Sequence, residues 1–494
     1  MQPVPVPTEP PIPTPTDACE RSRVEHTRAR RLMVLGQHRD IVLARLRAVI
    51  GTARADRMGE PDLSSNVLVG SASGLATLYD PDENGESTPT LRHPDEQAAA
   101  AMAAILDDGG IWPIMPRVQR DTLALREMLV RIDTVLDDDG LPHLSFRPVS
   151  PDVVEVTPHP RDPTRPIAIG EWRRRDAQWT KEIWSIAGEP RHAIVDPSGR
   201  DLSAEYGLPK GGLVGEEYPA RSVVTGRPVL PYVVYHAALG TGAVFDPYTW
   251  VEIVDGQLSC SVNWSLFSHC LRNAAWAQRW AIGAEIAGAT MGPDGRTGAP
   301  GDPANVIHLS PEEGYDGQPQ AGQWALTVDP EAFATSIGIH ERRLYSMAGM
   351  DPADVQRISG DPRSGYALEV SVRSKERSAL RFAPVFARPD AELVTVAAIL
   401  YNRALGFEFV PERLWSVEHA VVRAIHARAQ SGDGAHAQAL AAIIAQVSQG
   451  LLPLAGAAVI LQRSFALDER TALAMLSGAD VLAARALAAR GAAA

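Results

Sequence analysis

The middle of the sequence contains two long helical segments separated by a glycine- and proline-rich stretch. The first helix is predicted over 261–287, with apolar side chains around much of its circumference. The interruption covers 288–328, where "NVIHL" and "WALTV" predict two short strands, and a second helix follows over 331–349. A helix that is apolar on several sides must pack on several sides. We therefore expect this pair to bury its apolar faces partly against further copies of the chain.

The segment after the second helix is predicted to be an irregular loop followed by a long, bent helix. The loop spans 350–365 and includes Gly360 and Gly365, which allow a flexible backbone. The next helix begins near Tyr366, and Pro384 within it predicts a kink. The order helix, β-excursion, helix, loop and kinked helix is the strongest constraint that the sequence offers.

The N-terminal part of the chain is predicted to be mainly helical. Residues 1–17 are rich in proline and favour an extended arm. A basic amphipathic helix is expected over 21–50, and its predicted apolar face contains Leu32, Leu35, Val42, Leu46 and Val49. The stretch 62–140 is expected to be mostly helical, and five of its side chains fit one apolar stripe: Leu125, Met128, Leu129, Ile132 and Leu136.

Strand-like runs dominate the part of the chain between 143 and 254. "HLSFRPVSPDVVEV", "PIAIGEW", "WTKEIWSI" and "PVLPYVVYH" are short, rich in β-branched and aromatic residues, and bounded by proline, glycine and aspartate. This third of the chain is therefore expected to be α+β, whereas the alanine-rich stretch beyond about 411 is expected to be helical to its end.

Composition limits the classes of function. Apolar residues make up 45% of the 494 residues and charged residues 22%, as is usual for a soluble protein. No apolar run approaches the ~20 residues of a membrane span, so we expect no membrane partner. Cys19, Cys260 and Cys270 form no CxxC pair and are expected to be free thiols. The formal net charge of −13 argues against tight, static binding of phosphates.

Five segments, in order, resemble the portal proteins of tailed bacteriophages. "PHLSFRPVSPDVVEV" resembles the strands of the wing domain, and "GRPVLPYVVYH" resembles the strand before the first stem helix. The two helices that flank "NVIHLSPEEGYDGQPQAGQWALTV" resemble the stem, clip and stem. "SGDPRSGYALEVSVRSKE" resembles the start of the tunnel helix, and "GLLPLAGAAVILQRSFALDERTALAML" resembles part of a helical crown.

The resemblance implies a predominantly helical α+β chain with a portal fold that assembles as a cyclic ring. It divides the chain into a proline-rich arm (1–20), a wing (21–260), a first stem helix (261–287), a clip (288–330), a second stem helix (331–349), a tunnel loop (350–365), a kinked tunnel helix returning to the wing (366–410) and a crown (411–494). Such a ring, usually a dodecamer, forms the channel for double-stranded DNA at one capsid vertex. Its location would be the virion, after assembly in the host cytoplasm.

The candidate channel residues are the basic side chains of the predicted loop and of the helix after it. Arginines at 373, 377 and 381 are spaced i, i+4 and i+8 and form one stripe, and a conduit requires weak, repeated contacts with phosphates. Ion pairs between subunits would use the same stripe equally well. The candidate set is Arg357, Arg363, Arg373, Lys375, Arg377 and Arg381.

The implied partners include double-stranded DNA, the terminase, the major capsid and scaffolding proteins, and a head-completion or tail adaptor. Arg296, Glu312, Glu313 and Asp316 in the clip are candidates for contact with the terminase, although plain exposed turns would also explain them.

No catalytic, metal or cofactor site is predicted. "DPDENG" has the spacing of a calcium loop but carries Leu91 where the bidentate glutamate is needed. "GSASG" has Ala72 in place of a nucleophile, and "GPDGRTG" lacks the lysine of a phosphate-binding loop. The competing hypotheses are a nucleic-acid-processing enzyme of the packaging apparatus, and a helical virion protein that forms no conduit.

Overall fold

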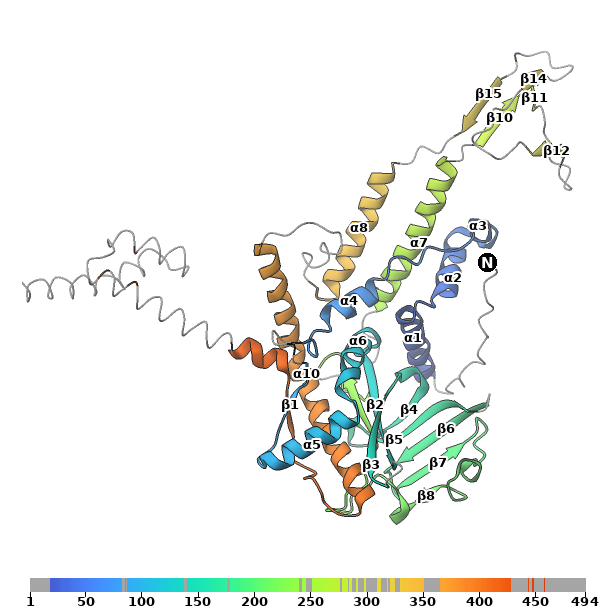
Figure 1. Cartoon of the computed structure of the whole chain (residues 1–494). Helices are drawn as coiled ribbons and strands as arrows, with labels where there is room; N and C mark the ends of the chain where they lie inside the picture. Colours follow the sequence, from blue (N-terminus) through green and yellow to red (C-terminus); the bar gives the residue numbers. More distant parts are fainter. Residues whose placement is uncertain are drawn as a thin grey trace, which may run out of the picture. The chain divides into compact units, whose positions relative to one another are not determined.

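The computed structural model describes most of the chain between residues 18 and 427 (Figure 1). The described residues are 18–81, 85, 87–136, 140–175, 178–239, 242–245, 251–275, 278–282, 284–286, 290–291, 297–298, 309–311, 318, 320–324, 329–350, 365–427, 443, 447 and 457. Residues 1–17 of the predicted arm and nearly all of the predicted crown beyond 427 lie outside them.

The chain divides into two compact units. Unit 1 comprises Met1–Asp80 and Pro89–Val417, and unit 2 comprises Pro81–Thr88 and Glu418–Ala494. The longest described element of unit 2 is a helix over residues 420–427. All sites discussed below belong to unit 1.

A three-stranded antiparallel sheet in unit 1 has the order β3–β2–β9. Its strands are β2 (Glu127–Leu136), β3 (Pro142–Val149) and β9 (Tyr232–His236). Leu129 of the central strand pairs with Val149 on one side and with Val234 on the other. The first six residues of β2 are buried, because helices as well as neighbouring strands pack against it.

The sequence-based prediction of a helix through 125–136 is therefore wrong. Helix α6 (Met115–Leu125) ends at Arg126, whose φ of 81° leaves the helical region, and strand β2 begins at the next residue. The first half of β2 is buried on both faces, so buried and exposed residues do not alternate there and the pattern by which strands are recognised is missing.

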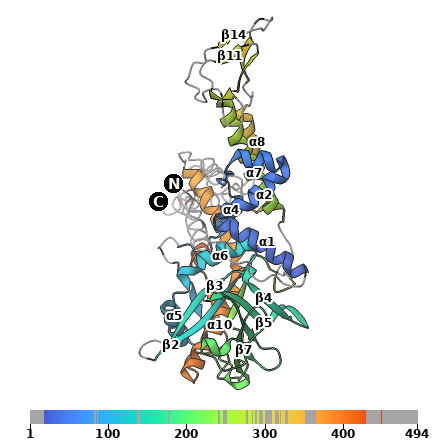
Figure 2. The same cartoon turned by 90° about the vertical axis from the view of Figure 1, so that its right-hand side faces the viewer.

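A five-stranded antiparallel sheet has the order β4–β5–β6–β7–β8, so that each strand pairs with its neighbour in sequence (Figure 1; Figure 2 shows the sheet from another side). The strands are β4 (Val154–His159), β5 (Asp162–Arg175), β6 (Gln178–Ser185), β7 (Arg191–Val195) and β8 (Leu213–Val214). The strand-like runs in this part of the sequence were correctly identified. Four short 3-10 segments also occur in unit 1: Trp112–Ile114, Pro151–Val153, Ser203–Tyr206 and Gly215–Glu217.

The helix predicted over 21–50 is two helices, α1 (Ala18–Val34) and α2 (Arg39–Ile50). Gly36, with a φ of 69°, lies in the break between them. Because of this break the predicted apolar face is not continuous: Val42 and Leu46 are buried, whereas Leu35 and Val49 are exposed. Helices α3 (Thr52–Met58) and α4 (Val67–Leu75) follow.

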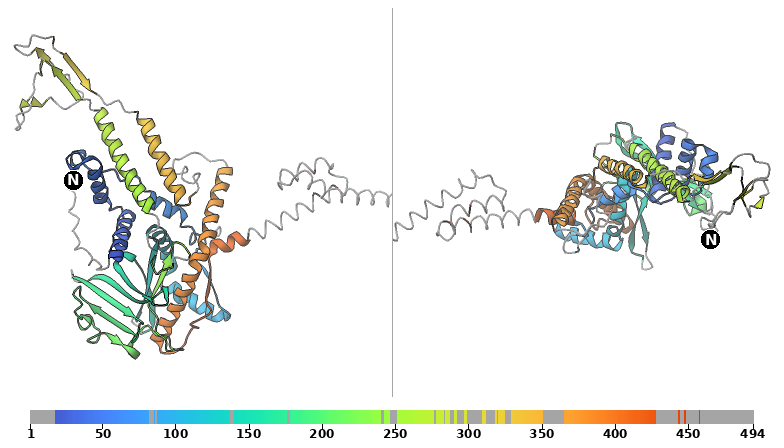
Figure 3. Two further views of the ribbon diagram at one scale, coloured as in Figure 1. Left: turned by 180° about the vertical axis from the view of Figure 1, so that it is seen from behind. Right: turned by 90° about the horizontal axis from the view of Figure 1, so that it is seen from above.

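Two long helices, α7 (Val251–Ala275) and α8 (Pro330–Met347), lie side by side in antiparallel directions (Figures 1 and 3). The rings of Phe267 and Phe333 stack at 5.3 Å, and Gly256 allows Leu344 to approach the backbone of α7 closely. Helix α8 agrees with its predicted range. Helix α7 begins ten residues earlier than predicted and ends twelve residues earlier.

The segment between these helices contains short antiparallel strand pairs. Strand β10 (Gln278–Ile282) pairs with β15 (Gln320–Trp324), β11 (Ala284–Ile286) pairs with β14 (Leu309–Pro311), and β12 (Thr290–Met291) pairs with β13 (Thr297–Gly298). Trp280, which was assigned to the first long helix, instead pairs with Gly322 in a strand.

The longest helix, α10 (Gly365–Leu405), packs on all three strands of the β3–β2–β9 sheet. It contains Pro384, where a kink was predicted, and also Pro389. A short β-pair joins β1 (Thr90–Arg92) to β16 (Ser416–Glu418), next to helix α5 (Glu96–Asp108). None of the described helices alone could span a membrane; only α5 together with residues 112–125, a bent pair, has the length and composition.

The predicted fold class is wrong as stated. A predominantly helical chain with a portal fold, assembled as a ring, was expected. The structure describes a single copy of the chain, with about 50% helix and 22% strand and with its strands in antiparallel sheets. The helical content was overestimated mainly because β2 and the two strands β10 and β11, which lie within the predicted first stem helix, were assigned to helices.

Candidate nucleic-acid interface

One face of helix α10 is fixed to the β-sheet by aromatic and polar contacts. The ring of Phe386 lies 6.1 Å from that of Tyr79 and 5.7 Å from that of Tyr235. The carboxylate of Asp390 accepts hydrogen bonds from both tyrosines, at 2.8 Å from the Tyr79 hydroxyl and 2.9 Å from that of Tyr235. Burial raises the pKa of both tyrosines well above its usual value, and the Asp390 charge adds to this. These contacts fix the rotation of the helix about its axis.

The opposite face of α10 carries a row of exposed arginines, Arg377, Arg381 and Arg388. With 3.6 residues per turn, all three project within about 40° of one another and roughly opposite Phe386. Among the described residues, no carboxylate forms a direct ion pair with any of them, although the charge of Arg388 opposes the rise that burial causes in the pKa of Glu392. We call these three side chains the arginine row. Exposed cations without a direct ion pair can bind an external anion.

The arginine row differs from the arginines near the two sheets, most of which are neutralised inside the protein. Arg31, for example, pairs with Asp152 at 3.1 Å, and Arg147 pairs with Glu171 at 2.8 Å. Because these arginines are already neutralised by the carboxylates that pair with them, they would attract an external anion only weakly. No direct ion pair among the described residues neutralises the arginine row.

Arg381 lies at the C-terminal end of helix α8. Its guanidinium group is so close to Gly349 that a Cβ added there would be 2.6 Å from Nη1, and its Cζ lies 5.2 Å from the centre of the Phe382 ring. Together with Arg126 and several apolar side chains it lines a cavity of about 210 Å³. A cation at a helix C-terminus is favourable because the helix dipole is negative there. Arg381 thus connects the arginine row to the second long helix.

Lys375 does not belong to the arginine row, although it was predicted with it. It lies two residues before Arg377, which places it about 160° away around the helix. Its main-chain oxygen accepts a hydrogen bond from the Thr77 hydroxyl at 3.2 Å. Burial raises the pKa of Asp80, and the Lys375 charge opposes that rise, so the amino group lies on the side of the α4–β1 connection.

The remaining predicted channel and clip residues have no described side chain. The backbone of Arg373 belongs to α10, but its side chain lies outside the described residues. The other predicted residues lie wholly outside them: Arg357, Arg363, Arg296, Glu312, Glu313 and Asp316.

Three cations of this region were missed by the sequence analysis. Arg388 continues the arginine row beyond Pro384, and its spacing of i+11 from Arg377 could have revealed it. Arg342 and Arg343 are exposed on α8, on the side away from the buried Leu344, and no described carboxylate pairs with either. The "ERR" run there was a visible signal.

A second group of charged side chains lies between the two sheets. Arg131 of β2 donates to Glu182 at 2.8 Å, to Glu171 at 3.3 Å and to the Tyr232 hydroxyl at 3.2 Å, and His192 lies 3.0 Å from Glu182. We call these five residues the intersheet cluster. Burial raises the pKa of Glu182, but hydrogen bonds from His192 and Arg131 outweigh it and hold that pKa far below its usual value. Both carboxylates are held ionised by several donors, so neither is suited to accept a proton near neutral pH.

In the described part of the chain, no three His, Cys, Asp or Glu side chains come together as a metal-binding group. Cys260 is buried between α4, α7 and α8, and burial raises the pKa of its thiol to about 12, so that it is a poor nucleophile.

No known protein family matches the sequence, and no curated protein matches it either.

Proposed function

We propose that this chain functions as a bacteriophage portal protein, one of several copies that enclose the channel through which double-stranded DNA enters and leaves the viral head. The observation that carries the proposal is the arginine row. It is exposed on a long helix whose opposite face is tied to a β-sheet by Phe386 and Asp390.

The electrostatics of this helix suit a passage better than a permanent binding site. Arginine presents several donors in a fixed plane that matches the geometry of phosphate oxygens. Each neutralised phosphate adds affinity, so a continuous basic surface would hold DNA in place. Three arginines on a chain with a net charge of −13 give a few weak contacts per copy. Such contacts guide DNA and still let it slide.

The two antiparallel helices and the strand pairs between them support the same proposal. They form a pair of antiparallel helices extended by strand pairs, of the kind that could bind a partner at one end of a channel, and α8 meets α10 where Gly349 contacts Arg381. We propose that the terminase, the head-completion or tail adaptor, and the capsid and scaffolding proteins are its partners in the virion. We further propose that the protein is not an enzyme, so that a partner supplies the energy for DNA movement.

The proposal is tested by reversing charge on the arginine row. The variant Arg377→Glu/Arg388→Glu should keep the oligomeric state and helical content of the wild type but should package DNA much more slowly. Both side chains are exposed and neither forms a direct ion pair among the described residues. Because the charge of Arg388 acts on the buried Glu392, circular dichroism checks that the variant is folded. The measurements are electron microscopy of the purified protein and a packaging assay with the complete motor.

A matched control carries the same change in charge elsewhere. Arg28 and Arg45 are exposed on α1 and α2, and no described carboxylate pairs with either. The variant Arg28→Glu/Arg45→Glu should package at the normal rate. Equal packaging by both double variants would contradict the role of the arginine row, and purified protein without a closed, perforated oligomer at any salt concentration would contradict the proposed function itself.

A further inference from the structure

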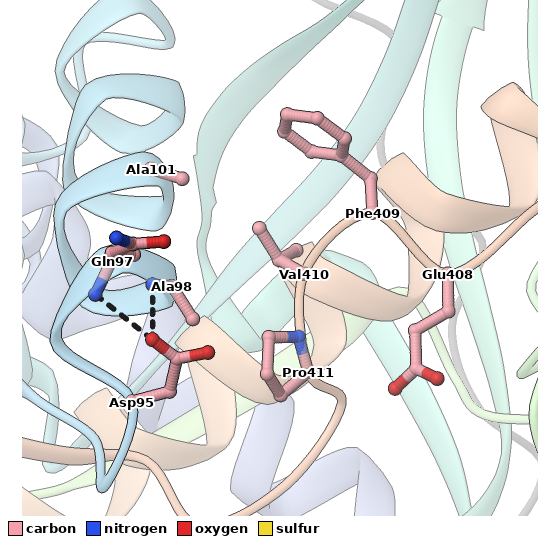
Figure 4. Close-up of a pocket in the computed structure, with 8 residues that line it drawn as sticks. All are labelled: Asp95, Gln97, Ala98, Ala101, Glu408, Phe409, Val410 and Pro411. Carbon is pink, nitrogen blue, oxygen red and sulfur yellow. Dashed lines mark hydrogen bonds between the residues drawn. The ribbon is translucent and has the colours of Figure 1, made fainter.

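A groove of about 480 Å³ lies between helix α5 and the loop that follows α10. Figure 4 shows its two walls: Asp95, Gln97, Ala98 and Ala101 on the side of α5, and residues Glu408 to Pro411 on the side of the loop. Both walls belong to unit 1. Alanine at two positions of α5 leaves room between the walls for side chains from outside.

The loop exposes large apolar side chains beside this groove. Among the phenylalanines whose burial is described, only Phe407 and Phe409 are exposed, at 55% and 53% of their surface. Leu414 is exposed at 74%, the largest value among the exposed large hydrophobic residues. Clusters of exposed aromatic residues commonly mark protein-binding surfaces.

These side chains are held rigidly by polar contacts under the loop. The Asn402 side chain accepts hydrogen bonds from the backbone NH groups of Phe409 and Val410, at 2.9 and 3.1 Å, and donates one to the Val410 carbonyl at 2.7 Å. The indole NH of Trp415 donates to the Pro411 carbonyl at 2.8 Å. A rigid surface loses little conformational entropy on binding, which favours affinity.

The backbone of Leu414 is strained in the orientation that exposes its side chain. Its φ of 65° lies in the left-handed region, which is unfavourable for a leucine. Strain of this kind persists when the surrounding contacts impose it, and it is concentrated at functional positions. A strained backbone that exposes Leu414, in the same loop as two exposed phenylalanines, points to a docking surface.

The charge of the groove indicates what could bind there. Its lining contains two carboxylates, Asp95 and Glu408, and no basic residue. Glu96 adds a further negative charge to the first turn of α5, whereas Arg413 is the one exposed cation of the loop. An apolar surface with an acidic rim is complementary to an apolar segment flanked by lysine or arginine.

We propose that this groove docks a basic, apolar segment of another protein, whose apolar side chains contact Phe407, Phe409 and Leu414 and whose cations lie near Asp95 and Glu408. The inference goes beyond the proposed function and does not depend on DNA passing along α10. The docking surface lies after the C-terminal end of α10, whereas Arg377 lies in the first half of that helix.

The test uses three short synthetic peptides with a fluorescent label. The first carries leucine and phenylalanine on one helical face and lysine on the other, the second replaces lysine by glutamate, and the third replaces the apolar residues by serine. Fluorescence anisotropy with the full-length protein should show binding of the first peptide only. Its affinity should fall as salt is added, because salt screens the contribution of the carboxylates.

Variants separate the groove from general attraction to an acidic protein. Phe407→Ser/Phe409→Ser leaves the net charge unchanged and should weaken binding of the first peptide at least about tenfold, since aromatic anchors supply most of the affinity at such surfaces. Glu408→Lys should also weaken it. The control Leu35→Ser/Val49→Ser, at apolar residues exposed elsewhere, should bind as the wild type does.

Three results would overturn the inference. The first is equal binding of the lysine and glutamate peptides. The second is equal affinity of the wild type and Phe407→Ser/Phe409→Ser. The third is self-association that disappears in that double variant, measured by sedimentation, because it would mean that a second copy of the chain covers the groove. Circular dichroism of the variant shows whether it is folded.

Discussion

Replacing Arg131 by methionine should destabilise the association of the two sheets by about 3 kcal/mol. The Arg131 side chain is 6% exposed, and its partners Glu171 and Glu182 are 2% and 4% exposed. Methionine fills much of the same volume but cannot donate to either carboxylate. The variant would therefore leave two buried negative charges with fewer donors.

The size of the effect follows from the partners that remain. Removing one member of a buried ion pair costs roughly 3–5 kcal/mol when the other member is left without a partner. Here Glu171 keeps Arg147 at 2.8 Å, and Glu182 keeps Arg175 at 2.7 Å. Because both carboxylates retain a cation, we expect the lower end of that range.

The variant should also shift the pH dependence of stability. Burial raises the pKa of Glu182, but its hydrogen-bond donors lower that pKa by more, so the pKa is lower in the folded state than in the unfolded state. Ionised Glu182 therefore stabilises the folded state at any pH above the ordinary glutamate pKa of about 4.3. This stabilisation is lost as the pH falls through the lower, folded-state pKa. Removing Arg131 raises the folded-state pKa of Glu182. Acid unfolding of the variant should therefore begin at a higher pH than that of the wild type.

Hydrogen exchange in strands β5 and β6, combined with urea unfolding followed by tryptophan fluorescence, measures the change locally. Adding Glu182→Gln to Arg131→Met should recover part of the lost stability, because one of the two buried charges is gone. Arg39→Met, at an exposed arginine, should have no measurable effect. Unchanged exchange in Arg131→Met, or no recovery in the double variant, would refute the argument.

Three further changes test the packing and the loop. Gly256→Val should destabilise the α7–α8 pair by about 1–3 kcal/mol in thermal unfolding, because a Cβ at this position would lie 2.4 Å from Leu344. Gly338→Ala should not destabilise the protein, because the space around Gly338 is open. Equal effects of the two variants would contradict the close packing of Leu344 on Gly256. Phe386→Ala should cost about 3–5 kcal/mol in urea unfolding, and a cost below 1 kcal/mol would mean that α10 is held elsewhere. Leu414→Asn should raise stability by about 1 kcal/mol and weaken binding of the basic peptide; lower stability would show that Leu414 is not strained.

The strands of the five-stranded sheet could be predicted because each is short and bounded by turn residues. In β6, for example, buried side chains alternate with less buried ones, and the strand pairs with β5 as far as Arg175 and Gln178. Helix α8 could be predicted because Ile337 and Leu344 repeat at helical spacing. In these segments the local pattern and the tertiary environment agree.

The pattern failed where burial was complete or where aromatic residues repeated by coincidence. Strand β2 is buried on both faces in its first half, so its apolar residues also fit a helix. Trp276 and Trp280 are spaced four apart and suggested a continued helix, but Trp280 belongs to strand β10. Hydrophobic periodicity cannot separate these cases without knowledge of the neighbouring elements.

The candidate sites show the same division. The spacing of Arg377 and Arg381 was visible in the sequence, but their exposure, and the position of Lys375 on another side of α10, depend on how the helix is rotated against the sheet. The docking groove could not be predicted, because "GFEFVPERLW" mixes apolar and charged residues without a period that shows which of them are exposed. Neither the exposure of its phenylalanines nor the φ of Leu414 can be inferred from residue types.

The anchoring of α10 explains how one helix could serve DNA without binding it tightly. Asp390 and Phe386 fix the helix from its buried side, so the arginines on the other side need no internal carboxylate to orient them. A carboxylate placed there to hold an arginine would cancel the charge that a phosphate would bind. Orientation from the apolar face and charge from the polar face are therefore independent, and Asp390→Asn should alter the stability of the helix on its sheet while leaving the charge of the arginine row unchanged.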